Sequence, residues 1–149
     1  MGKSLFISNS TWERIIWDKN LVGLIIVAVI FFLAYLAYRE PAVKIDSNAF
    51  RLRAVFYGVN IPFTEIAEAD TIAQHKMPAI SMRTNGISLL GVRRGHFKTK
   101  DGDKIRLSIS GKTSPVIRII DQQGTAYYIN RKNADETRHV FNKLSINYK

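Results

Sequence analysis

The sequence predicts a mainly β domain, an antiparallel barrel or sandwich with a C-terminal α-helix, preceded by a single transmembrane α-helix. Three patterns predict it: a long apolar run near the N-terminus, a series of short segments with alternating apolar and polar residues after Pro41, and one apolar stripe at helical spacing near the C-terminus. We therefore divide the 149 residues into an N-terminal segment (1–18), a membrane helix (19–39), a linker (40–46) and a β domain (47–149).

The apolar run carries no charged residue between Lys19 and Arg39. Its 19 residues would span about 28 Å as a helix, close to the thickness of a bilayer's hydrocarbon core. Aromatic and basic side chains that favour the membrane interface flank it. We predict these flanking residues as interface anchors: Trp17, Lys19, Tyr35, Tyr38 and Arg39.

A cleaved signal peptide is the alternative reading of this run. Signal peptides have shorter apolar regions and end in an Ala-x-Ala-like site, whereas Ala34 and Ala37 are spaced differently. The basic residues on the two flanks are nearly equal in number, so we place the C-terminal domain on the cytoplasmic side because an anionic inner leaflet attracts a basic domain. Trp12, Ile15 and Ile16 share helical spacing, so residues 1–18 are predicted either to continue the membrane helix or to form an interfacial helix.

The charge of the chain is strongly positive, +10 overall. From Pro41 onward, 18 Lys and Arg stand against 9 Asp and Glu, a net charge of +9. Such a surface favours anionic neighbours, and the adjacent membrane helix favours lipid over nucleic acid. Cysteine is absent, which excludes disulfides and thiolate metal sites.

Short strands separated by turn residues fill most of the domain. Phe50, Leu52, Ala54 and Phe56 alternate with polar or exposed neighbours and predict a half-buried strand. Asn85-Gly86 is a strong two-residue turn signal, so we expect one strand to end at Thr84 and another to begin at residue 87. Further strands are expected at 66–72, 95–99, 105–109, 116–120 and 126–129. This pattern predicts a closed or nearly closed barrel.

One helix is predicted to follow the strands, over residues 133–144. Ala134, Thr137, Val140 and Leu144 recur at steps of three and four and form one apolar stripe. Asn133 is the expected N-cap. The helix should pack against one opening of the barrel.

The hairpin around Gly102 carries the candidate binding site. A three-residue loop with Gly102 in the left-handed conformation places Phe97 opposite Ile105, so that apolar side chains share a face. The other face then presents the candidate anion or lipid-headgroup patch: His96, Lys98, Lys104 and Arg106. Lys98 directly opposes Lys104, and either these side chains extend into water or an anion binds between them.

We expect no catalytic, metal or cofactor site, because no motif for one occurs. The histidines His75, His96 and His139 are isolated, without the spacing of metal ligands. No nucleophile elbow or phosphate-binding glycine loop is found. The acidic residues Glu65, Glu68 and Asp70 form a small cluster, which fits an exposed rim as well as it fits a functional site. The sequence therefore predicts a protein that is not an enzyme.

Five segments occur in a characteristic order along residues 45–145: 57–66 (YGVNIPFTEI), 82–86 (MRTNG), 95–97 (GHF), 115–119 (PVIRI) and 128–130 (YIN). Together they resemble the bacterial pleckstrin-homology domain family, in members with an N-terminal transmembrane segment. The resemblance implies a pleckstrin-homology-like barrel, a non-catalytic role and a bacterial cytoplasmic membrane. It carries no ligand residues with it.

The function that these observations favour is a membrane-anchored, single-pass interaction module. Its partners are the bilayer itself and, through the basic face of the barrel, a protein or an anionic lipid. The alternatives are a tethered nucleic-acid-binding domain, which would need exposed aromatic rings for base stacking, and an accessory subunit of a membrane enzyme.

Overall fold

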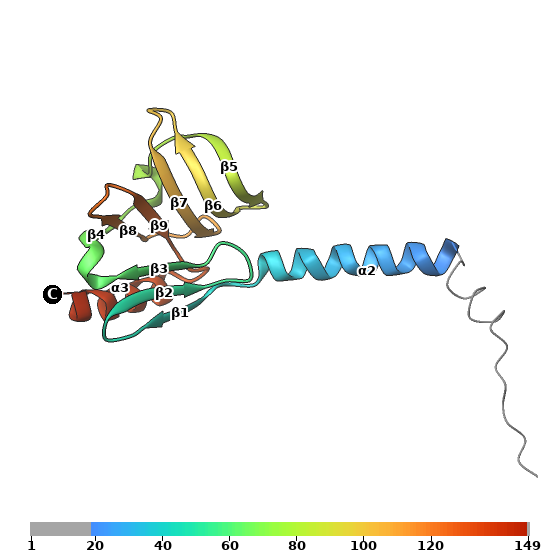
Figure 1. Cartoon of the computed structure of the whole chain (residues 1–149), viewed down its shortest axis with the longest axis horizontal. Helices are drawn as coiled ribbons and strands as arrows, with labels where there is room; N and C mark the ends of the chain where they lie inside the picture. Colours follow the sequence, from blue (N-terminus) through green and yellow to red (C-terminus); the bar gives the residue numbers. More distant parts are fainter. Residues whose placement is uncertain (1–18, 149) are drawn as a thin grey trace, which may run out of the picture. The chain divides into compact units, whose positions relative to one another are not determined.

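The apolar run forms the helix α2, Lys19–Tyr38, in a computed structural model that describes residues 19–148 (Figure 1). The chain divides into two compact units, with the boundary between Tyr38 and Arg39. Side chains are exposed all around α2 and none is buried. By length and composition the helix is able to cross a membrane, and a signal sequence would pass the same test.

The predicted interface anchors take up both ends of α2. Lys19 is its first residue, Tyr35 and Tyr38 lie in its last turn, and Arg39 follows it directly. The helix therefore ends one residue earlier than expected. Trp17 and the expected interfacial helix over residues 1–18 lie outside the described residues.

The second unit contains nine strands in two sheets, which Figure 1 shows as separate layers. The three-stranded sheet has the order β1-β2-β3, and the six-stranded sheet has the order β4-β8-β9-β7-β6-β5. The strands are β1 Ala42–Ile45, β2 Ala49–Arg53, β3 Val59–Pro62, β4 Ile66–Ile72, β5 Ile80–Leu89, β6 Val92–Thr99, β7 Lys104–Ser110, β8 Val116–Asp121 and β9 Ala126–Ile129. Two short 3-10 helices, Phe63–Glu65 and Gln74–Lys76, flank β4, and the helix α3, Ala134–Tyr148, follows β9.

The main core lies between the two sheets and α3. Phe50 and Ile61 of the three-stranded sheet pack with Ile117 and Ile119 of the six-stranded sheet, and Leu144 brings in α3. These five side chains are almost completely buried. Burial of side chains of this size stabilises a fold by about 1.5–3 kcal/mol each, so this cluster holds the sheets and the helix together.

A second core covers the opposite face of the six-stranded sheet. Phe97, Ile105, Leu107 and Tyr128 are buried there. Side chains from β4, from the segment that joins it to β5 and from the first residue of β5 cover them: Ile72, Met77 and Ile80. Both faces of the central strands are therefore buried, although their outer portions carry polar residues.

The expected register of the β6–β7 hairpin is confirmed. Phe97 pairs with Ile105, His96 with Arg106 and Lys98 with Lys104. Gly102 has a φ of 92°, the left-handed conformation that the three-residue loop requires. The helix that was expected to begin after Asn133 also forms, with Asp135 N donating to Asn133 Oδ1 at 2.8 Å, and it continues to Tyr148 rather than ending at residue 144.

The expected turn at Asn85-Gly86 is wrong, because β5 runs through it. Gly86 pairs with Gly95 across β5 and β6, and these backbones approach so closely that a Cβ on Gly86 would lie 2.3 Å from the Arg94 carbonyl oxygen. Glycine is therefore required at this position by the close contact between the two strands. The chain turns instead at Leu90 and Gly91, with φ angles of 45° and 84°. A left-handed leucine costs about 1–2 kcal/mol.

Three further features differ from the expectation. Strand β1 occupies most of the stretch expected as a linker over residues 40–46, so the β domain begins earlier. The strands form two sheets, which fits the sandwich alternative and not one closed barrel. Strands β7 and β9 pair in parallel, which a wholly antiparallel arrangement excludes. The mainly β fold with a helix before it and a helix after it is confirmed.

The close approach of β5 and β6 predicts an asymmetry between two left-handed glycines. Gly95 has a φ of 116°, and its Cβ would lie 2.3 Å from the Asn85 carbonyl oxygen, whereas a Cβ on Gly102 meets open space. We expect Gly95→Ala to lower the free energy of unfolding by about 2–4 kcal/mol, the sum of backbone strain and overpacking. Gly102→Ala should cost only the strain, about 1–2 kcal/mol.

Thermal unfolding of the full chain in detergent, followed by circular dichroism, compares the two variants. Equal losses of stability would contradict the close β5–β6 contact.

Candidate functional site

The predicted basic patch is assembled on one face of the β6–β7 hairpin. His96 and Lys98 project from β6 on the side opposite Phe97, and Lys104 and Arg106 project from the facing positions of β7. We call these four residues the basic face. The burial of Phe97 and Ile105 against the second core fixes which side of the sheet the basic residues occupy, because side chains alternate along a strand.

The basic face lines a surface hollow of about 420 Å³. Its wall contains no acidic residue: Thr84, Asn85, His96, Phe97, Lys98, Lys104, Ile105, Arg106 and Thr125. Among residues 19–148, no carboxylate lies within 4.0 Å of a basic nitrogen of this face. An anion bound in the hollow would relieve the opposition of Lys98 and Lys104.

Arg106 is held in place by an aromatic ring. Its guanidinium carbon lies 5.6 Å from the ring centre of Tyr127, its neighbour on β9, within the range of a cation–π contact. The Tyr127 hydroxyl donates to Asp121 Oδ2 at 3.0 Å. Burial, and then this hydrogen bond, raise the pKa of Tyr127 above its ordinary value, so the ring stays neutral beneath the guanidinium.

Part of the remaining positive charge is neutralised within the domain. Arg51 forms an ion pair with Asp46 at 3.1 Å. Arg118 joins the expected acidic rim, with Nη2 at 2.6 Å from Glu68 and 2.8 Å from Asp70. The acidic residues of β4 are therefore structural partners of β8, and the basic face has no such partners in the described part of the chain.

Arg93 and Arg94 do not extend the basic face together. They are neighbours in β6 and so point to opposite sides of the sheet. Arg94 shares the side of His96, but only 3% of it is exposed. Arg93 is exposed and lines a different hollow.

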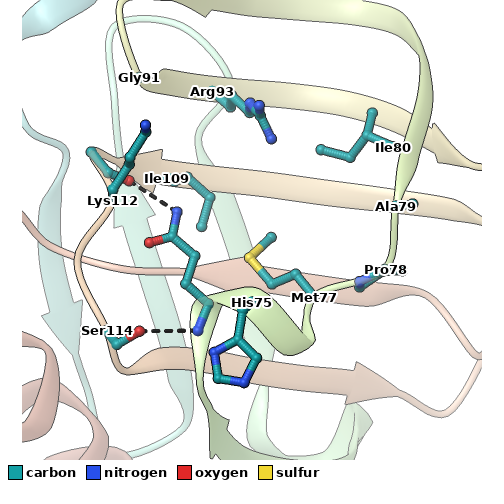
Figure 2. A pocket seen from close by; sticks show the side chains of 12 residues that line it. His75, Met77, Pro78, Ala79, Ile80, Gly91, Arg93, Ile109, Lys112 and Ser114 are labelled. Carbon is teal, nitrogen blue, oxygen red and sulfur yellow. Dashed lines mark hydrogen bonds between the residues drawn. The ribbon is translucent and has the colours of Figure 1, made fainter.

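This second hollow, of about 550 Å³, lies beside the second core (Figure 2). Met77, Ile80 and Ile109 provide apolar walls, and Arg93 and Lys112 provide positive charge. Gln74 fixes one side, with Nε2 donating to the Gly111 carbonyl oxygen at 3.1 Å. The sequence did not indicate this hollow, because its walls come from several separate segments.

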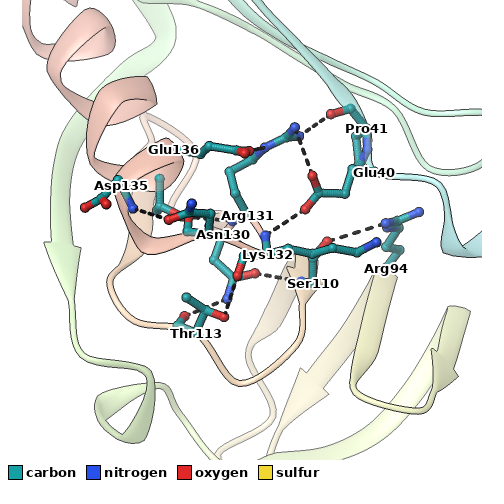
Figure 3. A network of polar contacts seen from close by, with 12 residues as sticks. Glu40, Pro41, Arg94, Ser110, Thr113, Asn130, Arg131, Lys132, Asp135 and Glu136 are labelled. Atoms are coloured by element: carbon teal, nitrogen blue, oxygen red, sulfur yellow. Dashed lines mark hydrogen bonds and ion pairs between the residues drawn. The ribbon is translucent and has the colours of Figure 1, made fainter.

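The polar cluster around Arg131 is a third feature, and it holds the first residues of the β domain (Figure 3). Arg131 Nη2 lies 3.2 Å from Glu40 Oε2, and its Nη1 donates to the Pro41 carbonyl oxygen. The backbone N–H of Lys132 donates to the other Glu40 oxygen at 2.7 Å. Arg131 Nε faces Glu136 of α3 at 3.4 Å. One guanidinium thus joins the start of the domain to the start of its last helix.

Arg94 holds the preceding residue. Its Nη1 donates to the Arg39 carbonyl oxygen at 2.7 Å, and its Nη2 lies 3.5 Å from Ser110 Oγ. Burial lowers the pKa of Arg94, and the nearby charge of Glu40 acts in the opposite direction. We call the contacts of Arg94 and Arg131 with residues 39–41 the junction clamp.

Asn130 connects the junction clamp to the six-stranded sheet. Its Oδ1 accepts from the Ser110 backbone N–H at 2.6 Å, and its Nδ2 donates to the Thr113 carbonyl oxygen at 2.7 Å (Figure 3). Asn130 is almost fully buried. Its side chain satisfies backbone groups that the strands leave open, so it fixes the segment from which Arg131 projects.

The junction clamp had no signal in the sequence. Arg131 lies about 90 positions from its partner Pro41, and Glu40 carries no motif that distinguishes it from an exposed glutamate. Only the pairing of β1 with β2 and the start of α3 at Ala134 bring these groups together.

No protein-family model matches the chain, and no match was found among curated proteins or solved structures.

The junction clamp predicts that Arg131 stabilises the fold, whereas Arg138 of α3 does not. Only 17% of the Arg131 side chain is exposed, against 60% of Arg138, whose ion pair with Asp135 lies on the surface of α3. We expect Arg131→Met to lower the free energy of unfolding by about 2–4 kcal/mol, because it leaves the Glu40 carboxylate without its partner. Arg138→Met should change it by less than about 0.5 kcal/mol.

Urea unfolding of the full chain in detergent compares these two variants. Similar free energies for both would contradict a structural role of the clamp.

Proposed function

We propose that the chain is a single-pass membrane protein with a non-catalytic β domain that presents its basic face to an acidic partner protein. Two observations together carry this proposal. The helix α2 has no buried side chain, and the junction clamp begins at the residue that follows it. Residues 39–41 are all that separate α2 from β1. An extended stretch from Tyr38 to Ala42 reaches at most about 14 Å, so the β domain stays close to the membrane surface.

The junction clamp also favours a retained anchor over a cleaved signal sequence. Glu40 and Pro41 contribute to the fold of the β domain through Arg131. Removal of the apolar segment together with these residues would leave a half-buried arginine without its partners, at a cost to stability. The native domain therefore includes the residues directly joined to α2.

The place of the basic face favours a protein partner over lipid. Lys98 lies four residues along β6 from Arg94, which holds the first residue of the domain. At about 3.3 Å per residue, that is about 13 Å of strand leading away from the junction clamp. An acidic protein surface beside the membrane can reach this position, and it would supply the carboxylates that the face lacks.

A nucleic-acid partner finds no support in the aromatic residues near this face. Tyr127 and Tyr128 are each less than one-tenth exposed, and Phe97 is buried in the second core. Stacking of bases requires exposed rings.

A pleckstrin-homology-like architecture belongs to this proposal as well. Two sheets and a C-terminal helix packed on the core support it. The parallel pairing of β7 with β9 is a departure from the antiparallel barrel that the resemblance implies. A cytoplasmic location of the domain is likewise proposed, since an anionic inner leaflet attracts a domain of net charge +9.

Lysine footprinting of the full chain tests the partner. Amine labelling is compared between native membranes and the purified chain in bilayers of extracted lipid from the same membranes, with mass spectrometry as the readout. We expect Lys98 and Lys104 to react at least about tenfold more slowly in native membranes, which corresponds to roughly 1.4 kcal/mol of contact energy. Lys76 and Lys143, exposed elsewhere on the domain, are the internal controls.

Arg106→Gln should abolish the protection of Lys98, whereas Arg83→Gln, on the opposite side of the sheet, should preserve it. Protection that already appears in extracted lipid and weakens with salt would assign the face to anionic lipid and overturn the protein partner. Equal labelling in both preparations would overturn any contact at this face.

A further inference from the structure

Large apolar side chains are exposed at two loops of the β domain. Across residues 39–148, the exposed ones are Val55, Phe56, Met82, Leu89, Leu90 and Ile146. Four of these six belong to the β2–β3 loop or to the β5–β6 turn, with Val55 59% and Leu90 83% exposed. We call Val55, Phe56, Leu89 and Leu90 the apolar rim. Clustering of this kind marks an interaction surface more than scattered exposure does.

Both loops lie at the end of the domain where the chain enters it. Ala42, the first residue of β1, pairs with Arg53, the last residue of β2, so the β2–β3 loop begins beside the entry point. Arg94 holds the Arg39 carbonyl oxygen at 2.7 Å, and the turn at Leu90 and Gly91 lies at the end of β6 opposite the β6–β7 hairpin. The Tyr57 hydroxyl donates to Asn85 Oδ1 at 2.9 Å, which ties the β2–β3 loop to the interior of β5. Arg39 is bonded covalently to the last residue of α2.

The stability of the domain does not explain the backbone conformation of the two loops that carry the apolar rim. Tyr57 and Leu90, with φ angles of 61° and 45°, are the only residues other than glycine with positive φ in the described part of the chain. Each stands in one of the two loops. Asn or Gly would suit such a position in a two-residue hairpin turn far better than leucine. A strained, exposed leucine gains nothing from the fold itself, so its role lies in a contact outside it.

Basic side chains flank both parts of the rim. Arg53 precedes the β2–β3 loop and Arg93 follows the β5–β6 turn, and both are exposed. Lys112 is exposed next to Gly111, whose backbone N–H donates to the Gly91 carbonyl oxygen of the turn. Apolar side chains bordered by cations suit the interface of a bilayer, where the former enter the acyl boundary and the latter meet anionic headgroups.

We propose that the apolar rim inserts into the interface of the membrane that α2 crosses and so fixes the orientation of the β domain on that membrane. This inference rests on the proposed anchor. Val92, which begins β6 directly after the turn, and Lys98 are six residues apart, about 20 Å at 3.3 Å per residue, so the β5–β6 turn and Lys98 lie toward opposite ends of this strand.

The absence of native cysteine allows a direct test with single nitroxide labels. Labels are attached to the full chain at Leu90→Cys and Phe56→Cys, with Gly102→Cys and Gln123→Cys as controls in other exposed loops and Ile30→Cys as a control within α2. The variants are reconstituted into vesicles of phosphatidylcholine with phosphatidylglycerol. Collision rates are measured with oxygen, which concentrates in the bilayer, and with a water-soluble nickel chelate.

We expect labels at positions 90 and 56 to collide several-fold more often with oxygen than with the nickel chelate, as the label at position 30 does. Labels at positions 102 and 123 should show the opposite preference. Circular dichroism of each labelled variant confirms the native content of strands.

Three outcomes would overturn the proposal. Labels at 90 and 56 that are as accessible to nickel as those at 102 and 123, with the label at 30 still in lipid, would refute insertion and leave the anchor intact. Labels at 90 and 56 shielded from both reagents would assign the rim to a protein contact, such as a second copy of the chain. A label at 30 accessible to nickel would refute the anchor itself.

Discussion

The junction clamp is the constraint on which the arrangement of the β domain depends. Arg131 binds Glu40 and the Pro41 carbonyl oxygen on one side and Glu136 of α3 on the other, while Arg94 binds the Arg39 carbonyl oxygen from β6. The start of β1 and the start of α3 are thereby fixed to each other. Because β1 begins directly after Pro41, the clamp also fixes the position of the first strand of the three-stranded sheet.

The basic residues of the domain have several different roles. Arg51 and Arg118 neutralise carboxylates of neighbouring strands, and Arg94 and Arg131 serve the clamp. These contacts lie within the domain and say nothing about a ligand. Part of what remains at the surface gathers in two places, the basic face of the β6–β7 hairpin and the cations that border the apolar rim. The net charge of +9 is thus weak evidence for a ligand, whereas the placement of the unpaired part is specific.

Local pairing rules account for what the sequence could predict. The Phe97–Ile105 register followed from alternation and from the left-handed preference of Gly102, and both depend only on residues within the hairpin. The turn predicted at Asn85-Gly86 is absent for a tertiary reason. Glycine is required at position 86 by the close contact with Gly95 and not by a turn. The clamp and the walls of the hollow beside Arg93 join segments far apart in the chain, and no local pattern encodes such distances. Leu89 and Leu90 resemble ordinary strand residues in the sequence, and only their exposure distinguishes them.

A retained membrane helix underlies every functional statement about this chain, so the most direct measurement is its fate in the membrane. Membranes from cells that express the full sequence are washed at alkaline pH, and the chain is then analysed by intact mass in both the pellet and the supernatant. The proposal predicts a chain that stays in the pellet with α2 present, near the 17.0 kDa of the whole sequence. A chain found in the supernatant, shortened so that α2 is missing, would show that the apolar segment is a cleaved signal and would contradict the proposal.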